Sequence, residues 1–418
     1  MIAPVSGAIQ STSIRTPESV KVNNHSFLHI LSEPCQGAVK FELSFPRNYD
    51  SPFELVYLAT RMLQEGTDKL SSKEIADRIA YYGAFLEIKL TNDFVNIELY
   101  CLKKFFGELA PLVFEIITTP SFPEKELTTL KNRYLQQLSN NLEKTSYLAS
   151  LHAKKELLGM DHPYASNTLD PIDTLETISI HQVISYYTNH IKEIAPTFFL
   201  TGDVEQEEIN LIIKLASSLT NIKVPSQLTK STPKSVQQSV QIPKEGTVQQ
   251  TVAMGKVAIA KQHPDFHKLS ITNSLLGGFF GSRLMKNIRE DKGYTYGIYS
   301  RITSFKHASF FYISTDLAPE HSINCINEIK KEITLLQNKL VDTEELMVLK
   351  NYLLGQFSSS VTSVFDHMRL FKSVNNQGLT LDYYKQYLAT LESITSEEIQ
   401  QMAISYLDTE KWLELTVG

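Results

Sequence analysis

The feature that most constrains this chain is residues 275–300, LLGGFFGSRLMKNIREDKGYTYGIYS, which predict two helices and a strand separated by sharp turns. The glycine pair near the start is expected in a tight turn, because glycine adopts positive φ without steric cost. Residues 282–291 have helical spacing, and Gly293 just beyond them predicts the end of that helix. Residues 294–299 are rich in strand-forming side chains.

Arg289 falls at the end of that predicted helix, and Tyr296 follows seven positions later on the predicted strand. A guanidinium and a phenol both donate hydrogen bonds, and together they suit a carbonyl oxygen that develops negative charge. The alternative is a surface arginine and an ordinary core tyrosine. Spacing alone leaves both interpretations open.

The stretch resembles the carboxy-terminal half-domain of the pitrilysin family, which includes the mitochondrial processing peptidases and the insulin-degrading enzyme. The resemblance implies that the Arg and the Tyr reach a zinc site on the other half of the molecule and hold the substrate carbonyl. The matching positions are a glycine-rich turn, a Ser-Arg-Leu helix start, a later glycine and the Arg/Tyr pair: Gly277, Gly278, Ser282, Arg283, Leu284, Arg289, Gly293 and Tyr296.

A chain of 418 residues is too long for one typical core, which indicates two or more domains. Residues 1–22 predict an extended amino-terminal arm, and the Pro/Ser/Thr/Gln/Lys-rich residues 221–245 predict a linker. The order of strands and helices over residues 23–220 returns over residues 246–418. We therefore expect an α+β fold of two tandem homologous half-domains, each an antiparallel-rich sheet with helices on one face. Sequence identity between the two halves is faint, so the duplication rests on the order of elements and on the resemblance.

The resemblance also implies a zinc motif, and this chain has lost it. Active members carry HxxEH on the first helix of the amino-terminal half, with a second Glu on a later helix. Anchoring the segment VYLATRMLQEGT on its Gly-Thr places Tyr57, Thr60 and Arg61 at the His, Glu and His positions, and Gln137 at the distal Glu. Because a fixed cation repels Zn²⁺, we expect no metal site in this chain.

The strand that binds the peptide in active members also departs from the family pattern. Glu87 and Ile88, in YYGAFLEIKLTND, stand where those members have Asn-Ala. Strand pairing uses backbone groups, so this edge could still bind a peptide.

Histidines also occur outside these motifs. His263 and His267 flank a predicted helix start with Asp265 between them. They predict a cap region with solvated imidazoles, and a weak metal group is the alternative. His162, in the segment His-Pro-Tyr, matches a family loop and is expected to be structural.

Composition excludes several classes of protein. The formal charge of −6 argues against a nucleic-acid binder, and no apolar run is long enough to span a bilayer. No signal peptide is visible, which predicts a cytoplasmic location, or a periplasmic one if a signal has been removed. Cys35, Cys101 and Cys325 predict reduced core thiols.

The leading hypothesis is a non-zinc-binding subunit of a heterodimeric zinc metallopeptidase. A homologous partner with HxxEH would supply zinc and the general base, and this chain would supply Arg289 and Tyr296 for peptide hydrolysis in a closed chamber. The chain would be inactive alone, and a homodimer is possible in isolation. The alternatives are a catalytically inactive structural or assembly subunit of the same fold, and a peptidase with an unfamiliar metal site.

Overall fold

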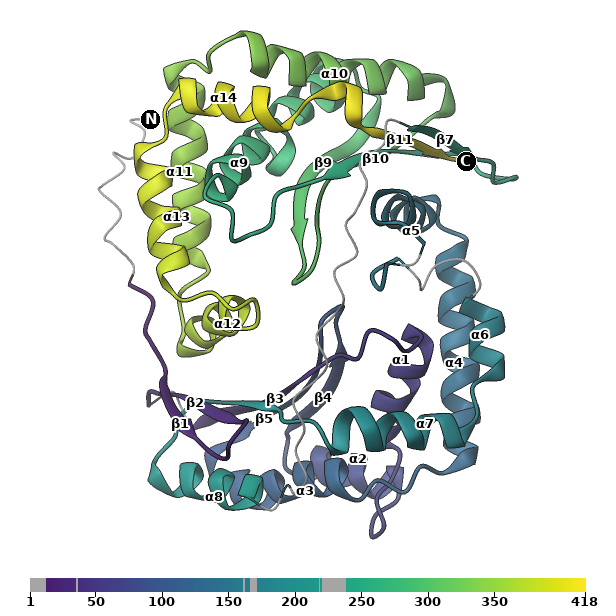
Figure 1. The fold of residues 1–418 in the computed structure, drawn as a ribbon, viewed down its shortest axis with the longest axis vertical. Helices are drawn as coiled ribbons and strands as arrows, with labels where there is room; N and C mark the ends of the chain where they lie inside the picture. Colours follow the sequence, from purple (N-terminus) through teal and green to yellow (C-terminus); the bar gives the residue numbers. More distant parts are fainter. Residues whose placement is uncertain (1–12, 35–36, 161, 166–170, 218, 220–237) are drawn as a thin grey trace.

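The computed structural model describes residues 13–34, 37–160, 162–165, 171–217, 219 and 238–418, which form two sheets surrounded by helices (Figure 1). The first sheet has the order β1-β2-β6-β3-β5-β4, and the second has the order β7-β11-β8-β10-β9. Neighbouring strands are antiparallel except β2 with β6 and β7 with β11. The expected α+β architecture with two antiparallel-rich sheets is confirmed.

The bounds of the strands follow the chain from the first sheet to the second. They are β1 (Glu18–Lys21), β2 (Phe27–Ser32), β3 (Ala38–Pro46), β4 (Phe85–Leu90), β5 (Phe94–Leu102), β6 (Thr197–Gly202), β7 (Gln238–Ile242), β8 (Gln250–Val257), β9 (Thr295–Ser304), β10 (Ser309–Leu317) and β11 (Leu413–Val417).

The α-helices fall into one set before β7 and one set after it. The first set is α1 (Phe53–Arg61), α2 (Ser72–Tyr81), α3 (Phe106–Thr118), α4 (Glu124–Leu142), α5 (Thr145–Leu158), α6 (Pro171–Thr177), α7 (Ile180–Tyr187) and α8 (Gln206–Ser217). The second set is α9 (Phe266–Asn273), α10 (Ser322–Asn338), α11 (Thr343–Ser359), α12 (Val364–Asn375), α13 (Asp382–Ser393) and α14 (Ser396–Tyr406).

Each sheet has a hydrophobic core on its outer side. Figure 1 shows α3 and α8 outside the first sheet and α10 outside the second. Phe41 on β3 is fully buried, and its ring centroid lies 6.1 Å from that of Phe106 and 6.0 Å from that of Phe114, both on α3. In the second half, Trp412 is fully buried, with its ring 5.2 Å from that of Phe311 on β10. Burying rings of this size contributes much of the hydrophobic stabilisation.

A helix from the first half covers part of the inner face of the second sheet. Ala149, Ala153 and Leu157 on α5 belong to one buried cluster with residues of β8, β10 and β11. A Cβ atom on Gly255 of β8 would lie 2.9 Å from Cδ1 of Leu157, so glycine at this position lets α5 approach the sheet closely.

A helix from the second half covers the first sheet in the reciprocal way. Val364 and Met368 on α12 pack on Leu31 of β2 and Phe199 of β6. Each sheet therefore has helices of its own half on the outer face and one helix of the other half on the inner face (Figure 1). The prediction of helices on one face of each sheet did not include this second contact. An apolar helix stripe shows that a face is buried, but it does not identify the sheet that buries it.

Two segments expected to be irregular contain strands. Within the predicted arm, β1 pairs antiparallel with β2. Within the predicted linker, β7 pairs parallel with β11, because its alternate residues Val240 and Ile242 pack against the cluster under α5. The parts of these predictions that cover residues 1–12 and 220–237 lie outside the described residues, and the exact half-domain boundaries stay a prediction.

The structure describes two of the three cysteines. Cys101 and Cys325 are buried free thiols, and burial raises the pKa of each to about 12. Both therefore stay protonated and unreactive at neutral pH. Cys35 lies outside the described residues.

His29 on β2 gives the junction between the halves a predicted sensitivity to acid. Its ring is 8% exposed and lies 4.8 Å from Phe371 of α12 and 5.3 Å from Phe199. Burial lowers the pKa of His29 from 6.5 to about 4. Between these values the unfolded chain binds a proton that the folded chain excludes, so the free energy of unfolding falls as the pH drops through that window.

We expect His29 to account for a loss of about 3 kcal/mol between pH 7 and pH 4, which the variant His29→Phe does not show. Urea denaturation of both proteins across this range measures the difference. Equal pH dependence in the two proteins would contradict the assignment, since the other histidines are common to both.

Candidate functional site

The glycine-rich turn lies where two short π-helical segments meet β9. These segments are Ser274–Gly278 and Met285–Asp291. The expectation of positive φ at Gly277 and Gly278 is wrong, since neither residue adopts it. A Cβ on Gly277 would lie 2.7 Å from Cβ of Ser300, so glycine is needed because β9 passes close to the turn.

The end of the second segment agrees with the prediction. Gly293 has φ of +65°, the left-handed conformation that glycine adopts readily. The Tyr294 amide donates to the carbonyl of Ile288 at 3.0 Å, which ties the start of β9 back onto the helical segment. The turn therefore fixes the direction in which β9 leaves the end of the segment that carries Arg289.

Two arginines on this stretch differ in how they are held. Arg283 forms a paired hydrogen bond with Glu345 on α11, with Nε to Oε1 at 2.9 Å and Nη2 to Oε2 at 2.7 Å. Arg289 has no carboxylate partner in the described residues, and its guanidinium lies 4.6 Å above the ring of Phe280, which is 62% exposed. Arg283 therefore has a structural role, whereas the charge of Arg289 remains available to bind a ligand.

The Tyr296 hydroxyl is likewise available to bind a ligand. Tyr296 is 92% exposed, and its hydroxyl forms no hydrogen bond within the described part of the chain. It lies on β9, the edge strand of the second sheet, where a bulge interrupts the pairing with β10 between Thr315 and Leu317. The core-tyrosine interpretation is therefore wrong, and Tyr296 presents its phenol outward from the edge of the sheet.

The positions of the lost zinc motif lie on α1 and form a packed cluster. The Thr60 hydroxyl donates within its own helix, at 2.9 Å to the carbonyls of Val56 and Tyr57. The Tyr57 ring stacks 4.2 Å from that of Tyr134 on α4, and the Arg61 guanidinium lies 5.6 Å from the Tyr57 ring. An aromatic stack capped by a cation thus occupies the place of the ligand set.

Gln137 lies on α4, one turn beyond Tyr134, and is exposed. The residues present do not fit zinc, because they offer a phenol, an internally bonded hydroxyl, a guanidinium and an amide. Across the described ranges, no three His, Cys, Asp or Glu side chains come together in a group suited to a metal ion.

We expect the purified chain to bind no stoichiometric zinc, since Arg61 places a permanent positive charge at a ligand position. Elemental analysis after exhaustive dialysis measures this directly. One zinc per chain that resists dialysis, together with peptidase activity that a chelator removes, would contradict the expectation.

Glu87 and Ile88 lie on β4, the edge strand of the first sheet. Ile88 is fully buried and faces the core, while Glu87 is exposed and pairs with Lys89 at 2.9 Å. The outer edge of β4 has no neighbouring strand in the described sheet, so its backbone remains a possible site for an added strand.

The histidines singled out in the sequence differ in their surroundings. The prediction of a cap region with solvated imidazoles holds for His263, which is exposed and whose Nδ1 accepts from the Asp265 amide at 3.1 Å, but it is wrong for His267. His267 is buried, with its ring 4.3 Å from that of Tyr383. Asp265 is the N-cap residue of α9, but its carboxylate makes no capping hydrogen bond and accepts instead from the Tyr406 hydroxyl at 2.6 Å. His162 is buried, and its Nδ1 accepts from the Tyr164 amide at 3.1 Å, as a structural residue would.

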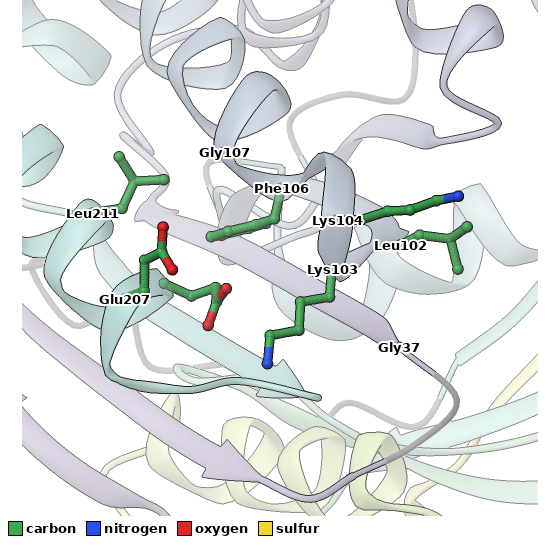
Figure 2. A pocket seen from close by; sticks show the side chains of 9 residues that line it. Gly37, Leu102, Lys103, Lys104, Phe106, Gly107, Glu207 and Leu211 are labelled. Carbon is green, nitrogen blue, oxygen red and sulfur yellow. The ribbon is translucent and has the colours of Figure 1, made fainter.

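A cavity of about 610 Å³ lies far from these residues, between the β5–α3 connection and α8. Figure 2 shows Lys103 and Glu207 on different sides of this cavity with Phe106 between them, and Lys104 directed away. Lys103 is already paired with Glu205 at 2.8 Å and Asp203 at 3.2 Å. No motif predicted the cavity, because its lining comes from segments far apart in the sequence, and it brings none of the predicted site residues together.

In the described part of the chain, no helix combines the length and apolar content needed to cross a bilayer. Residues 177–384 match the family described as the peptidase M16 inactive domain. A Helicobacter pylori protein named non-peptidase homolog YmxG is 26% identical over 361 residues, which cover 82% of this chain and 80% of that protein. The probable inactive metalloprotease YmfF of Bacillus subtilis is 21% identical over 320 residues, covering 76% and 74%. Among solved structures, the peptidase M16 inactive domain from Pseudomonas fluorescens has a TM-score of 0.86 at 22% identity, covering 96% of this chain and 98% of that one.

Proposed function

We propose that this chain, which belongs to the peptidase M16 family through the inactive domain at residues 177–384, is the zinc-less subunit of a two-chain zinc peptidase. A homologous partner with an intact HxxEH motif holds zinc, and its Glu activates the water. This chain contributes Arg289 and Tyr296, which donate hydrogen bonds to the substrate carbonyl as it becomes an oxyanion.

The observation that carries the proposal is the availability of both donors. Arg289 and Tyr296 have no hydrogen-bond or ionic partner in the described residues, although Arg283 on the same stretch is fully paired. A purely structural chain has no need to hold a cation against an exposed Phe280 and a phenol 92% exposed on an edge strand. The names of the two relatives, non-peptidase homolog and probable inactive metalloprotease, agree with a chain that is inactive alone.

The test is reconstitution. The chain is mixed with a homologue from the same genome that carries HxxEH, and complex formation is followed by size-exclusion chromatography. We expect hydrolysis of an unstructured peptide by the mixture, none by this chain alone, and none when the Glu of the partner's HxxEH motif is replaced by Gln. A complex that assembles but leaves the partner's activity unchanged would favour the structural or assembly subunit.

A further inference from the structure

The inner face of the second sheet carries a cation on its edge strand, β9. Arg301 on β9 lies directly across from Tyr312 on β10, and its guanidinium is 5.7 Å from the Tyr312 ring. Ile298 and Ser300 are buried on the outer side of the strand, so Tyr299 and Arg301 face inward by the alternation of side chains. Both are exposed, and Tyr299 is 60% exposed.

A second cation reaches this region from α5, which crosses the same face (Figure 1). Leu157 of α5 lies over Gly255, and Gly255 is the register partner of Tyr312. Lys154 precedes Leu157 by three positions and therefore lies one turn away on the same side of the helix. Burial, followed by the charge of Arg301, lowers the pKa of Lys154, so the two cations are close enough to repel each other.

Neither cation is neutralised by a carboxylate in the described part of the chain. Lys154 and Arg301 form no ion pair within the described ranges. Asp316, the carboxylate further along β10, is held by the hydroxyl of Thr251, which in turn bonds the hydroxyl of Thr145 at 2.8 Å. This part of the inner face therefore has an excess of positive charge that is partly shielded from water.

The corresponding face of the first sheet shows what a neutralised surface looks like in this fold. Lys40 pairs with Glu42 at 2.7 Å and with Glu98 at 3.4 Å. Lys89 also pairs with Glu98, at 3.2 Å. Even Lys372, which reaches in from α12 as Lys154 does from α5, pairs with Glu42 at 3.5 Å. Unlike these lysines at the first sheet, Lys154 and Arg301 have no ion-pair partner among the described residues.

We propose that Lys154 and Arg301 form a subsite for a carboxylate of a bound peptide, supplied either by an acidic side chain or by a free carboxyl terminus. A carboxylate between the two cations relieves their repulsion, and it accepts paired hydrogen bonds that the planar guanidinium of Arg301 donates. β9 is the edge strand of the described sheet, and the Ser300 carbonyl beside Arg301 accepts from Asn273 at 3.2 Å, so a peptide would pair with β9 beyond that point. This subsite rests on the proposed function, and it specifies the substrate class as peptides with an acidic group beside the segment held at β9.

The test measures binding of three fluorescent decapeptides to the full isolated chain by anisotropy. One has a central Glu and an amidated end, the second has Gln in its place, and the third has that Gln with a free carboxyl terminus. We expect the first or the third peptide to bind about tenfold more tightly than the second, and the identity of the tighter peptide distinguishes the two sources.

The preference should fall to within about twofold in Lys154→Gln and in Arg301→Gln. It should persist in Lys155→Gln, a matched loss of one charge on the same helix. Equal binding of all three peptides, binding of none, or an unchanged preference in the first two variants overturns the subsite. Hydrolysis of the neutral peptide by the reconstituted complex is measured separately. If the subsite fails, the proposed function is still supported by that hydrolysis. If reconstitution fails, the binding preference of the isolated chain still supports the subsite.

Discussion

A reconstituted complex should lose about two orders of magnitude in turnover when Tyr296 is replaced by Phe. The substitution removes one hydroxyl and keeps the ring, and the hydroxyl has no partner in the described structure. A donor that acts only on the developing oxyanion stabilises the transition state more than the bound peptide. The loss should therefore fall on kcat, with little change in KM.

The matched control is Tyr81→Phe, since Tyr81 is also highly exposed, at 84%, but lies on α2 of the first half. Its activity should equal that of the wild-type complex. Arg289→Ala should lower kcat and also raise KM, because a charged donor holds the carbonyl in the ground state too. Full activity in both Tyr296→Phe and Arg289→Ala would mean that this chain only closes the chamber.

Replacing Asp93 by Ala should cost about 4 kcal/mol in the free energy of unfolding, because it leaves the hydroxyls of the buried Tyr164 and the half-buried Tyr49 without their charged acceptor. The Asp93 carboxylate accepts from the hydroxyls of Tyr49, at 2.7 Å, and Tyr164. It also accepts from the amide of Lys306 at 3.1 Å. Lys306 lies in the turn between β9 and β10, so this carboxylate joins the two halves of the chain at the strand that carries Tyr296.

Urea denaturation provides the measurement, and Asp77→Ala provides the control. Asp77 is exposed on α2 and makes no interaction in the described structure, so its removal should change stability by less than about 0.5 kcal/mol. Asp93→Asn should fall between the two, since an amide oxygen still accepts but carries no charge. Equal stability of Asp93→Ala and Asp77→Ala would contradict the role of this junction.

Sequence patterns predicted the local elements well and their long-range partners poorly. The stop at Gly293 depends on a few neighbouring residues, and it occurs as expected. The close passage of β9 beside Gly277 depends on a strand more than twenty residues away, so the conformational reason first given for that glycine was wrong.

For the candidate site too, the sequence identified the residues but not their partners. The order of residues and the family resemblance identified Arg289 and Tyr296, but only the structure shows that Arg283 is bonded to Glu345 while Arg289 is not. The proximity of Lys154 to Arg301 had no sequence signal, because the two cations come from different halves of the chain and are brought near each other only by the crossing of α5. Burial and partner choice of this kind follow from tertiary packing, which periodicity does not encode.

The central claim is that Tyr296 lies at the zinc of a partner subunit, and a paramagnetic distance measurement tests it most directly. Fluorotyrosine is placed at position 296 alone, and the partner's zinc is replaced by Co²⁺. Our account predicts that the ¹⁹F signal broadens in the Co²⁺ complex relative to the Zn²⁺ complex, while the same label at position 81 is unaffected. An identical signal from position 296 in both complexes would contradict the claim.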